Sequence, residues 1–497
     1  MSYLQSGFDF IIGLGGPAMM LFVLTILAVA FRAPFGKSLE GGIRMAIALT
    51  GMSSIITLLT NAFGPALNAF VDSTGLHLSI TDLGWAPLAL ITWSSVYTLY
   101  FALICAALNI VMIFLKLTKT LNVDLFNIWN LSIIGLLVNS FAHNMVVTSL
   151  FVLFVYTMML LNADAMKPTI NHLLGWDSKN ITVTAHACFL IAPLAMLVNK
   201  LIDVCLPFID KFDFDAETLN KRIGFWGSKF VIGAFLGVFI GLLGRQSAAD
   251  VFTLAFTGGV ALELFSVVGG WFGLAIAPLS DAVQNVMTKR FKGRELYVAI
   301  DWPIVAARPE LWAVVNILAP ILLLISMVLP GSQVMPLGGI LMTVLVPALL
   351  IVTGGRVIRM TLIGTILIPV YLWAATLIAP FVTSTSKALG TFPSSLKKNQ
   401  MFTSIDSNPI EKMLGMMLGK GFHELDWKML VAFAAGIVVY LLLFWWYRGE
   451  IQRQLKKHVD RENAKNVLEA SAPSAENTQD EHPSEADSVR DAEPVLQ

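Results

Sequence analysis

Long apolar runs, separated by shorter polar segments, fill the first 450 residues of the chain. A run of about 20 apolar residues spans the hydrocarbon core of a bilayer, and tilt widens the usable range. Eleven runs meet this condition, at residues 10–32, 43–63, 96–117, 123–140, 145–163, 229–246, 251–275, 311–329, 340–353, 360–383 and 429–447. The pattern therefore predicts an all-α membrane protein with about eleven transmembrane helices.

The apolar runs form two sets that look like copies of each other. The stretch "FGPALNAFVDSTGLHLSITDLGWAP" is echoed by "LSDAVQNVMTKRFKGRELYVAIDWP", so that Asp301 follows Asp82 by 219 residues. Gln333 follows Asn122 by 211 residues, and a similar shift carries the amphipathic segment near 191–203 onto the one near 407–419. We interpret these two amphipathic segments as re-entrant or interfacial helices, because they are too polar to span comfortably.

The duplication predicts the organisation of the chain. We expect a first repeat at 1–163, with scaffold helices at 10–63 and a core from 64, and a second at 229–428, with scaffold helices at 229–275 and a core from 276. A cytoplasmic linker with an amphipathic helix fills 164–228, and a last transmembrane helix lies at 429–448. The tail at 449–497 is basic as far as Lys465 and then acidic and free of aromatic residues, which predicts disorder.

Basic residues indicate that the two repeats have opposite orientations in the membrane. Residues 64–95 contain no Lys or Arg, whereas the corresponding segment 276–310 contains five. By the positive-inside rule the first segment is outside and the second is cytoplasmic. The same rule places the N-terminus outside and the C-terminus in the cytoplasm. It also makes the loop at 32–44 cytoplasmic, through Arg32, Lys37 and Arg44, and the end of the third span, through Lys116 and Lys119. Inverted repeats with polar breaks near the midplane are typical of alternating-access transporters.

Composition narrows the class further. With 56% hydrophobic and 13% charged residues, the chain has far more apolar surface than one soluble core buries. The N-terminal run lacks a basic segment and a cleavage site, so we expect it to be retained. Cys105, Cys188 and Cys205 form no CxxC pair and lie in apolar or amphipathic surroundings, which predicts buried thiols. We expect no metal, no cofactor, no ATP hydrolysis and no nucleic-acid partner.

Polar side chains at bilayer depth are the candidate ligand contacts, because burying them there is costly. Amides and carboxylates bond vicinal hydroxyl groups, and indole faces stack on the C–H face of a sugar, so this set suits a neutral polyhydroxylated ligand. The predicted substrate-binding residues are Asp82, Trp85, Thr92, Asn122, Asn127, Asn139, His143, Asp301 and Gln333.

Structural roles also account for these residues. Asp82 and Asp301 are each suited to capping a short helix at a re-entrant tip. Asn122 lies at a span entrance and Trp85 is compatible with an aromatic belt. His143 interrupts a long apolar run, which a turn between two spans explains equally well.

Glu263 lies near the centre of the predicted span 251–275. A carboxylate at this depth is either a proton-coupling group or a partner in a hydrogen bond across a dimer seam. We favour the dimer seam.

Three motifs resemble the membrane IIC component of the galactitol family of the bacterial phosphotransferase system. They are "DLGWAPLALITW", "NVDLFNIWN" and "LPGSQVMPLG", and the resemblance runs from about residue 10 to 450. It implies uptake of a sugar or polyol across the inner membrane, with phosphorylation by a separate IIB subunit that carries a phosphocysteine, itself served by a IIA subunit. Similarity to the ascorbate-type IIC fold implies a homodimer embedded in lipid, in which a core moves like an elevator against a scaffold.

The chain departs from the family pattern at several positions. Ala86 and Pro87 replace a Pro and a Gly, Asn130 stands where the motif ends in His, and "AARPE" at 306–310 replaces a Gly-His pattern. Our prediction is a dimeric permease subunit for a galactitol-like hexitol or related sugar, which holds no catalytic residue and acts only with IIB. The alternatives are a proton-coupled secondary transporter, titrating Asp82, Asp301 or Glu263, and a transport-inactive membrane sensor with the same fold.

Overall fold

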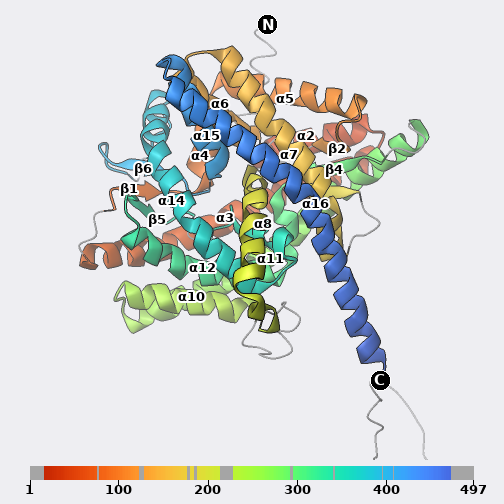
Figure 1. Ribbon diagram of the computed structural model, residues 1–497. Coiled ribbons are helices and arrows are strands. Elements are labelled where there is room, and N and C mark those ends of the chain that lie inside the picture. The colour runs from red at the N-terminus through yellow and green to blue at the C-terminus, as the bar shows by residue number, and fades with distance from the viewer. Residues whose placement is uncertain are drawn as a thin grey trace, which may run out of the picture. The chain divides into compact units, whose positions relative to one another are not determined.

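The computed structural model is mostly helical (Figure 1) and describes residues 16–74, 78–122, 128–175, 180–183, 187–212, 228–290, 295–339, 342–393, 396–406 and 408–471. Residues as far as Leu455 form one compact unit, and those from Lys456 form a second. The helix α16 (Trp427–Ser471) joins the predicted last span to the basic segment without a break. The predicted disordered tail from 472 lies outside the described residues.

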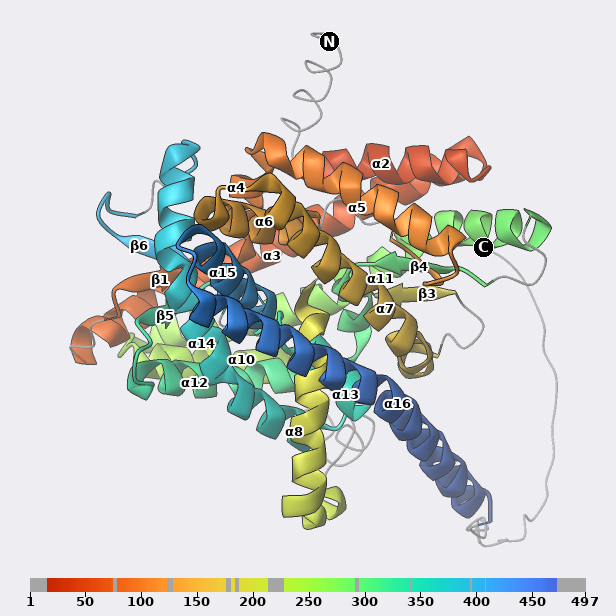
Figure 2. The same ribbon diagram turned by 45° about the horizontal axis from the view of Figure 1, so that its top comes forward.

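Four helices from the two predicted scaffold regions pack together: α2 (Gly16–Ala30), α3 (Phe35–Thr74), α10 (Lys229–Leu243) and α11 (Ala248–Arg290) (Figure 2). Glycines spaced four residues apart allow α10 to approach α11 closely. A Cβ atom on Gly237 would lie 2.1 Å from the Leu254 carbonyl oxygen, and one on Gly233 would lie 2.3 Å from that of Gly258. Backbones in contact through small residues are the usual means of helix association in membranes.

Six helical segments of the described chain are long and apolar enough to cross a membrane, judged by length and composition. They are α5 (Val96–Phe114), α7 (Met145–Leu174), Cys188–Cys205, α12 (Pro309–Val328), α14 (Val357–Ala388) and the stretch Trp427–Lys457 of α16. The segment Cys188–Cys205 consists of η1 (Ala187–Ile191) and α8 (Ala192–Cys205). It covers the region near 191–203, for which an amphipathic re-entrant or interfacial helix is predicted, and that assignment stays a prediction.

In the described part of the chain, two predicted spans contain a short helix. Within 342–353 this helix is α13 (Val346–Thr353), whose 8 residues extend about 12 Å and cannot cross a hydrocarbon core of about 30 Å. The run 123–140 yields α6 (Ile128–Ala142), a shorter apolar helix. Hydropathy alone detects apolar residues and does not detect where the helix begins, so the count of eleven spans stays a prediction.

Six short strands in the described part of the chain correct the expectation of a purely helical protein. β1 (Ile80–Asp82) lies between β5 (Val334–Pro336) and β6 (Met401–Thr403) in one parallel sheet. β4 (Tyr297–Ile300) lies between β2 (Thr120–Asn122) and β3 (Ile181–Val183) in another. We call these sheet A and sheet B. The strands are only three or four residues long, which is too short for an alternating pattern to be recognised in the sequence.

The strand order reflects the duplication. The central strand of sheet A comes from the first half of the chain and its two neighbours from the second half, and sheet B has the reverse arrangement. β6 begins at Met401 and β3 at Ile181, a spacing of 220 residues that is close to the spacing between Asp82 and Asp301. Neither sheet forms from one half alone, so strand pairing locks the two halves together.

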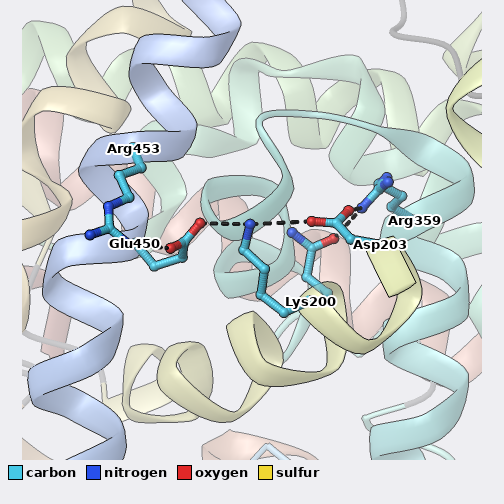
Figure 3. Close-up of polar contacts among 6 residues, drawn as sticks. Lys200, Asp203, Arg359, Glu450 and Arg453 are labelled. Carbon is cyan, nitrogen blue, oxygen red and sulfur yellow. Dashed lines mark hydrogen bonds and ion pairs between the residues drawn. The ribbon is translucent and has the colours of Figure 1, made fainter. Parts of the chain in front are cut away.

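An ion network connects three helices (Figure 3). Lys200 on α8 places its Nζ atom 2.6 Å from Glu450 Oε1 on α16 and 3.2 Å from Asp203 Oδ2. Arg359 on α14 donates to Asp203 Oδ1 at 2.6 Å. Arg453 completes the chain of contacts, 3.4 Å from Glu450 Oε2. The network fixes α16 to the body of the molecule.

The cysteines agree only partly with the expectation of three buried thiols. Cys105 and Cys188 are buried, but Cys205, at the end of α8, is exposed. The amphipathic character of α8 explains the difference, because one side of the last helical turn faces away from the core.

Candidate functional site

The carboxylate of Asp82 holds together the loops that follow the three strands of sheet A. Its Oδ1 accepts hydrogen bonds from the backbone amides of Gly84 at 3.1 Å and Ile405 at 3.0 Å, and Oδ2 accepts one from Gly339 at 2.6 Å. The side chain is completely buried. Parallel strands end at the same edge of a sheet, and the one carboxylate satisfies an amide beyond each strand.

Glycine is required at this edge by the close approach of the loops. A Cβ atom on Gly338 would lie 2.2 Å from the Gly84 nitrogen, and one on Gly339 would lie 3.0 Å from Asp82 Oδ2. Gly84 itself has φ of 71°, in the left-handed region that favours glycine. The loops therefore form a tight cradle around Asp82.

Asp406 is a second buried carboxylate next to this cradle. It follows β6, is 5% exposed, and interacts electrostatically with Asp82. The backbone amide of Trp85, the first residue of α4 (Trp85–Trp93), donates a hydrogen bond to Asp406. The Oδ1 atom of Asp406 has no hydrogen-bond partner among the residues that the structure describes. The first turn of α4 thus provides a partly positive environment for one end of this carboxylate.

The first turn of α15 (Pro409–His423) adds a buried pair of opposite charges. Glu411 and Lys412 are both 2% exposed, and Lys412 Nζ lies 3.9 Å from Glu411 Oε1, beyond hydrogen-bonding distance. Within the described part of the chain, neither oxygen of Glu411 has a hydrogen-bond partner. The Asn408 side chain lies near Glu411 as a weak donor outside ordinary hydrogen-bond geometry, and it accepts a hydrogen bond from the Tyr371 hydroxyl at 3.4 Å. Buried polar atoms of this kind are costly unless a ligand or water satisfies them.

Sheet B brings a further carboxylate to the same region. Asp301 follows β4 and caps η4 (Trp302–Ala307), where its Oδ1 accepts a hydrogen bond from the Trp302 amide at 2.7 Å. Cys188, in the η1 helix that follows β3, interacts electrostatically with Asp301, Asp406 and Glu411. Cys188 thus links the carboxylates that follow the two sheets, and we call this group of residues the polar centre: Asp82, Asp301, Asp406, Glu411 and Lys412.

Four other predicted residues, on or next to the elements of sheets A and B, have different surroundings. Trp85 is half-buried, with its ring centroid 6.2 Å from that of Trp129. Thr92 is buried and donates to the Ala89 carbonyl. Asn122 is held at the end of β2 by Asn109, whose Oδ1 accepts from its backbone amide at 2.9 Å. Gln333 is exposed where β5 begins, at the opposite edge of sheet A from Asp82, and bonds Ser79 at 2.7 Å. Of these residues, Trp85 is the one that contacts the polar centre.

His143 and Asn139 lie at the far end of α15. His143 is exposed in the turn between α6 and α7, its amide donates to the Asn139 carbonyl, and its ring centroid is 4.9 Å from that of His423. Twelve residues of α15 separate Glu411 from His423, which corresponds to about 18 Å. The structure therefore places His143 away from the polar centre. Asn127 lies outside the described residues.

Asp406, Glu411 and Lys412 are not among the residues predicted from the sequence. The segment near 407–419 is predicted to be an amphipathic helix, in which charged side chains are expected on a solvated face. The available signal was the pattern Asn-Pro-x-Glu-Lys, which marks the start of a helix directly after a polar break. A helix that begins within the protein buries its first turn together with those charges.

Comparisons with known proteins agree with this architecture. Residues 10–395 match the family described as the PTS system sugar-specific permease component. A candidate permease IIC component of Escherichia coli (strain K12) is 26% identical over 440 residues, which cover 88% of this chain and 98% of that protein. The galactitol-specific EIIC components of strains K12 and O157:H7 are each 24% identical over 412 residues, covering 82% of this chain and 89% of theirs. Since the family match covers well over half of its length, the chain belongs to the sugar-specific permease (IIC) components of the phosphotransferase system.

Proposed function

We propose that this chain carries a hexitol or a related polyol across the inner membrane and presents it for phosphorylation by a separate IIB subunit, which a IIA subunit recharges. The observation that carries the proposal is the polar centre, where loops from both halves of a duplicated fold meet. In transporters with inverted repeats, the substrate site lies at such a repeat interface, next to helices that begin within the membrane. α4 and α15 are helices of this kind, since α4 begins at the half-buried Trp85 and α15 at the buried Pro409, both next to the polar centre.

The chemistry of the polar centre supports a polyol. Carboxylates accept hydrogen bonds from vicinal hydroxyl groups, and the Trp85 and Trp129 rings offer apolar faces for C–H groups. Asp82 acts in this proposal as a positioning residue, because its carboxylate already accepts three backbone hydrogen bonds. Asp301, Asp406 and Glu411 are the proposed ligand contacts. The galactitol specificity named for two relatives supports the same ligand class.

An elevator motion requires a rigid group against which the core moves. We assign this role to α2, α3, α10 and α11, whose glycine contacts suit close, permanent packing. Glu263 is exposed on α11, in a long apolar helix, and a hydrogen bond across a homodimer seam would satisfy it there. The dimer and the elevator motion are both part of the proposal.

In this proposal, the edge at which sheet B begins lies on the cytoplasmic face of the protein. Lys119 and Lys167 lie 5.5 Å and 5.1 Å from the centroid of the Tyr297 ring. The hydrogen bond that Lys119 donates to the Tyr297 hydroxyl raises the pKa of Lys119, so this group is charged at neutral pH. Cations in this position suit the approach of a phosphorylated partner.

In this account the chain contributes orientation to the phosphoryl transfer. The oxygen of a substrate hydroxyl attacks the phosphorus of the IIB phosphocysteine, the P–S bond breaks, and the hydroxyl proton is released. Holding the two reactants in line is itself a large part of such catalysis. The test is the chemical form of galactitol accumulated by cells that express the chain with and without a IIB partner. Galactitol phosphate that appears only with IIB supports the proposal, and its absence with an active IIB partner refutes it.

A second candidate function is proton-coupled secondary transport. It is favoured by the buried carboxylates of Asp406 and Glu411, whose open oxygens are able to bind a proton. The two functions differ in the product that accumulates, because a proton-coupled transporter concentrates free polyol. A sensor with the same fold would accumulate neither form.

A further inference from the structure

Among the described residues, the buried side-chain atoms of the polar centre that lack a hydrogen-bond partner are all carboxylate oxygens. They are Oδ1 of Asp406 and both oxygens of Glu411, each buried and without a hydrogen-bond partner in the described residues. An ionised carboxylate accepts hydrogen bonds and donates none. A bound molecule that satisfies these atoms has to supply several donors close together.

The charge of the polar centre also favours a ligand that carries no negative charge. It contains four carboxylates, on Asp82, Asp301, Asp406 and Glu411, and one cation, Lys412. Asp82 is engaged by three backbone amides, and Lys412 stands closest to Glu411, at 3.9 Å. A further negative charge would enter a buried region already rich in carboxylates, where like charges repel strongly.

We propose that Glu411 and Asp406 are specificity-determining residues that select donor-rich neutral or cationic polyols, such as hexitols and amino-hexitols, and exclude sugar acids. This rests on the proposed function and adds the basis of ligand choice. Glu411 accepts hydrogen bonds from two adjacent hydroxyl or ammonium groups of the ligand, and Asp406 accepts a third. Lys412, with its Nζ 3.9 Å from Glu411 Oε1, is the cation next to this acceptor.

A purely structural role for Glu411 makes different predictions. An acidic residue in the first turn of a helix stabilises that helix through its dipole, whatever ligand is present. In that case replacing Glu411 lowers stability and leaves the ratios of the ligand affinities unchanged. In our proposal the same substitution narrows the preference for galactitol over galactonate.

The experiment measures binding to the purified full-length protein by calorimetry, using galactitol, 1-amino-1-deoxygalactitol, galactonate and a deoxygalactitol as probes. We expect the wild type to bind galactonate at least about a hundredfold more weakly than galactitol. Glu411→Gln weakens galactitol binding about tenfold or more, the range for a lost charge-assisted hydrogen bond, and narrows the galactitol-to-galactonate ratio at least about tenfold. Asp406→Asn weakens galactitol binding in the same range.

Glu424→Gln is the matched control, since Glu424 is an exposed carboxylate that directly follows the last residue of the same helix. It leaves all four affinities unchanged. Equal binding of galactitol and galactonate by the wild type overturns the inference but does not contradict the proposed transport of a polyol. An unchanged preference in a folded Glu411→Gln protein also overturns it. If Glu411→Gln does not fold, the inference is tested by the affinities of Glu411→Asp and of the wild type for the same four probes. Binding of none of the four probes by the wild type refutes the proposed polyol function and the inference with it.

Discussion

The Oδ2 atom of Asp82 accepts a hydrogen bond at 2.6 Å from the backbone amide of Gly339, which lies 257 residues away in the sequence. This bond joins the end of β1, from the first half of the chain, to the loop after β5, from the second. Because the same carboxylate also bonds Gly84 and Ile405, one side chain connects the loops after all three strands of sheet A. The geometry of the polar centre depends on it.

Replacing Asp82 is therefore expected to reduce stability as well as binding. In Asp82→Asn the amide NH2 group faces a backbone N–H that loses its acceptor, which costs about 1–3 kcal/mol. Thermal unfolding in detergent measures the loss. Asp406→Asn is the comparison, because Asp406 Oδ1 has no described partner, and it should affect unfolding much less. Equal unfolding temperatures for wild type and Asp82→Asn would contradict the positioning role.

The ion network in Figure 3 predicts strong coupling between α8 and α16. Lys200→Met leaves Glu450, whose side chain is 8% exposed, without its closest cation. Glu450→Gln leaves Lys200 with Asp203, at 3.2 Å, as its carboxylate partner. Breaking a fully buried pair costs about 3–5 kcal/mol, and we expect a smaller loss here because the Lys200 side chain is 24% exposed, whereas removing both charges costs less. A double-mutant cycle on unfolding free energies measures this. Additive losses for Lys200→Met and Glu450→Gln would show that the 2.6 Å contact carries no coupling energy.

The close packing of α10 on α11 predicts that Gly237 does not tolerate a side chain. A Cβ atom there would lie 2.1 Å from a backbone oxygen, so Gly237→Ala forces the helices apart and costs about 1–3 kcal/mol, as overpacking usually does. Gly36→Ala is the control, since a Cβ atom on Gly36 meets nothing within 4 Å. The two variants are compared by thermal unfolding, and similar melting temperatures for both would argue against the glycine contact.

The inverted orientation of the repeats is tested by labelling single cysteines from each side of the membrane. Ser73 and Glu295 are suitable positions, because both are exposed and lie in corresponding, oppositely charged segments. The background must lack the native thiols, and above all the exposed Cys205. We expect Ser73→Cys to react from outside and Glu295→Cys from the cytoplasm. Reaction of both from one side would remove the basis for inverted repeats.

The duplication was predictable from the sequence because it depends on spacing. The separation of Asp82 from Asp301 anticipated that corresponding strands would lie about 220 residues apart, as β3 and β6 do. The strands themselves were not predictable, since three residues display no period and their hydrogen bonds join distant segments. The same limit applies to α13, whose apolar residues read as part of a span.

The candidate site was predictable in part. Asp82 and Asp301 were selected because a carboxylate in an apolar stretch is unusual, and both prove to lie at the ends of central strands. Glu411 and Lys412 were missed, because a charged pair next to Pro409 is also typical of an exposed helix start. Only the tertiary arrangement, which buries the first turn of α15 against α14 and α6, distinguishes the two cases.

The most direct test of the central claim is uptake of radiolabelled galactitol into vesicles that contain this chain, with and without the IIA and IIB proteins and a phosphoryl donor. A variant in which Cys105, Cys188 and Cys205 are all replaced by Ser or Ala should behave like the wild type, because the phosphoryl group arrives on the IIB cysteine. We predict galactitol phosphate inside the vesicles only when IIB is present. Free galactitol, concentrated without these proteins and lost when the proton gradient collapses, would contradict the account.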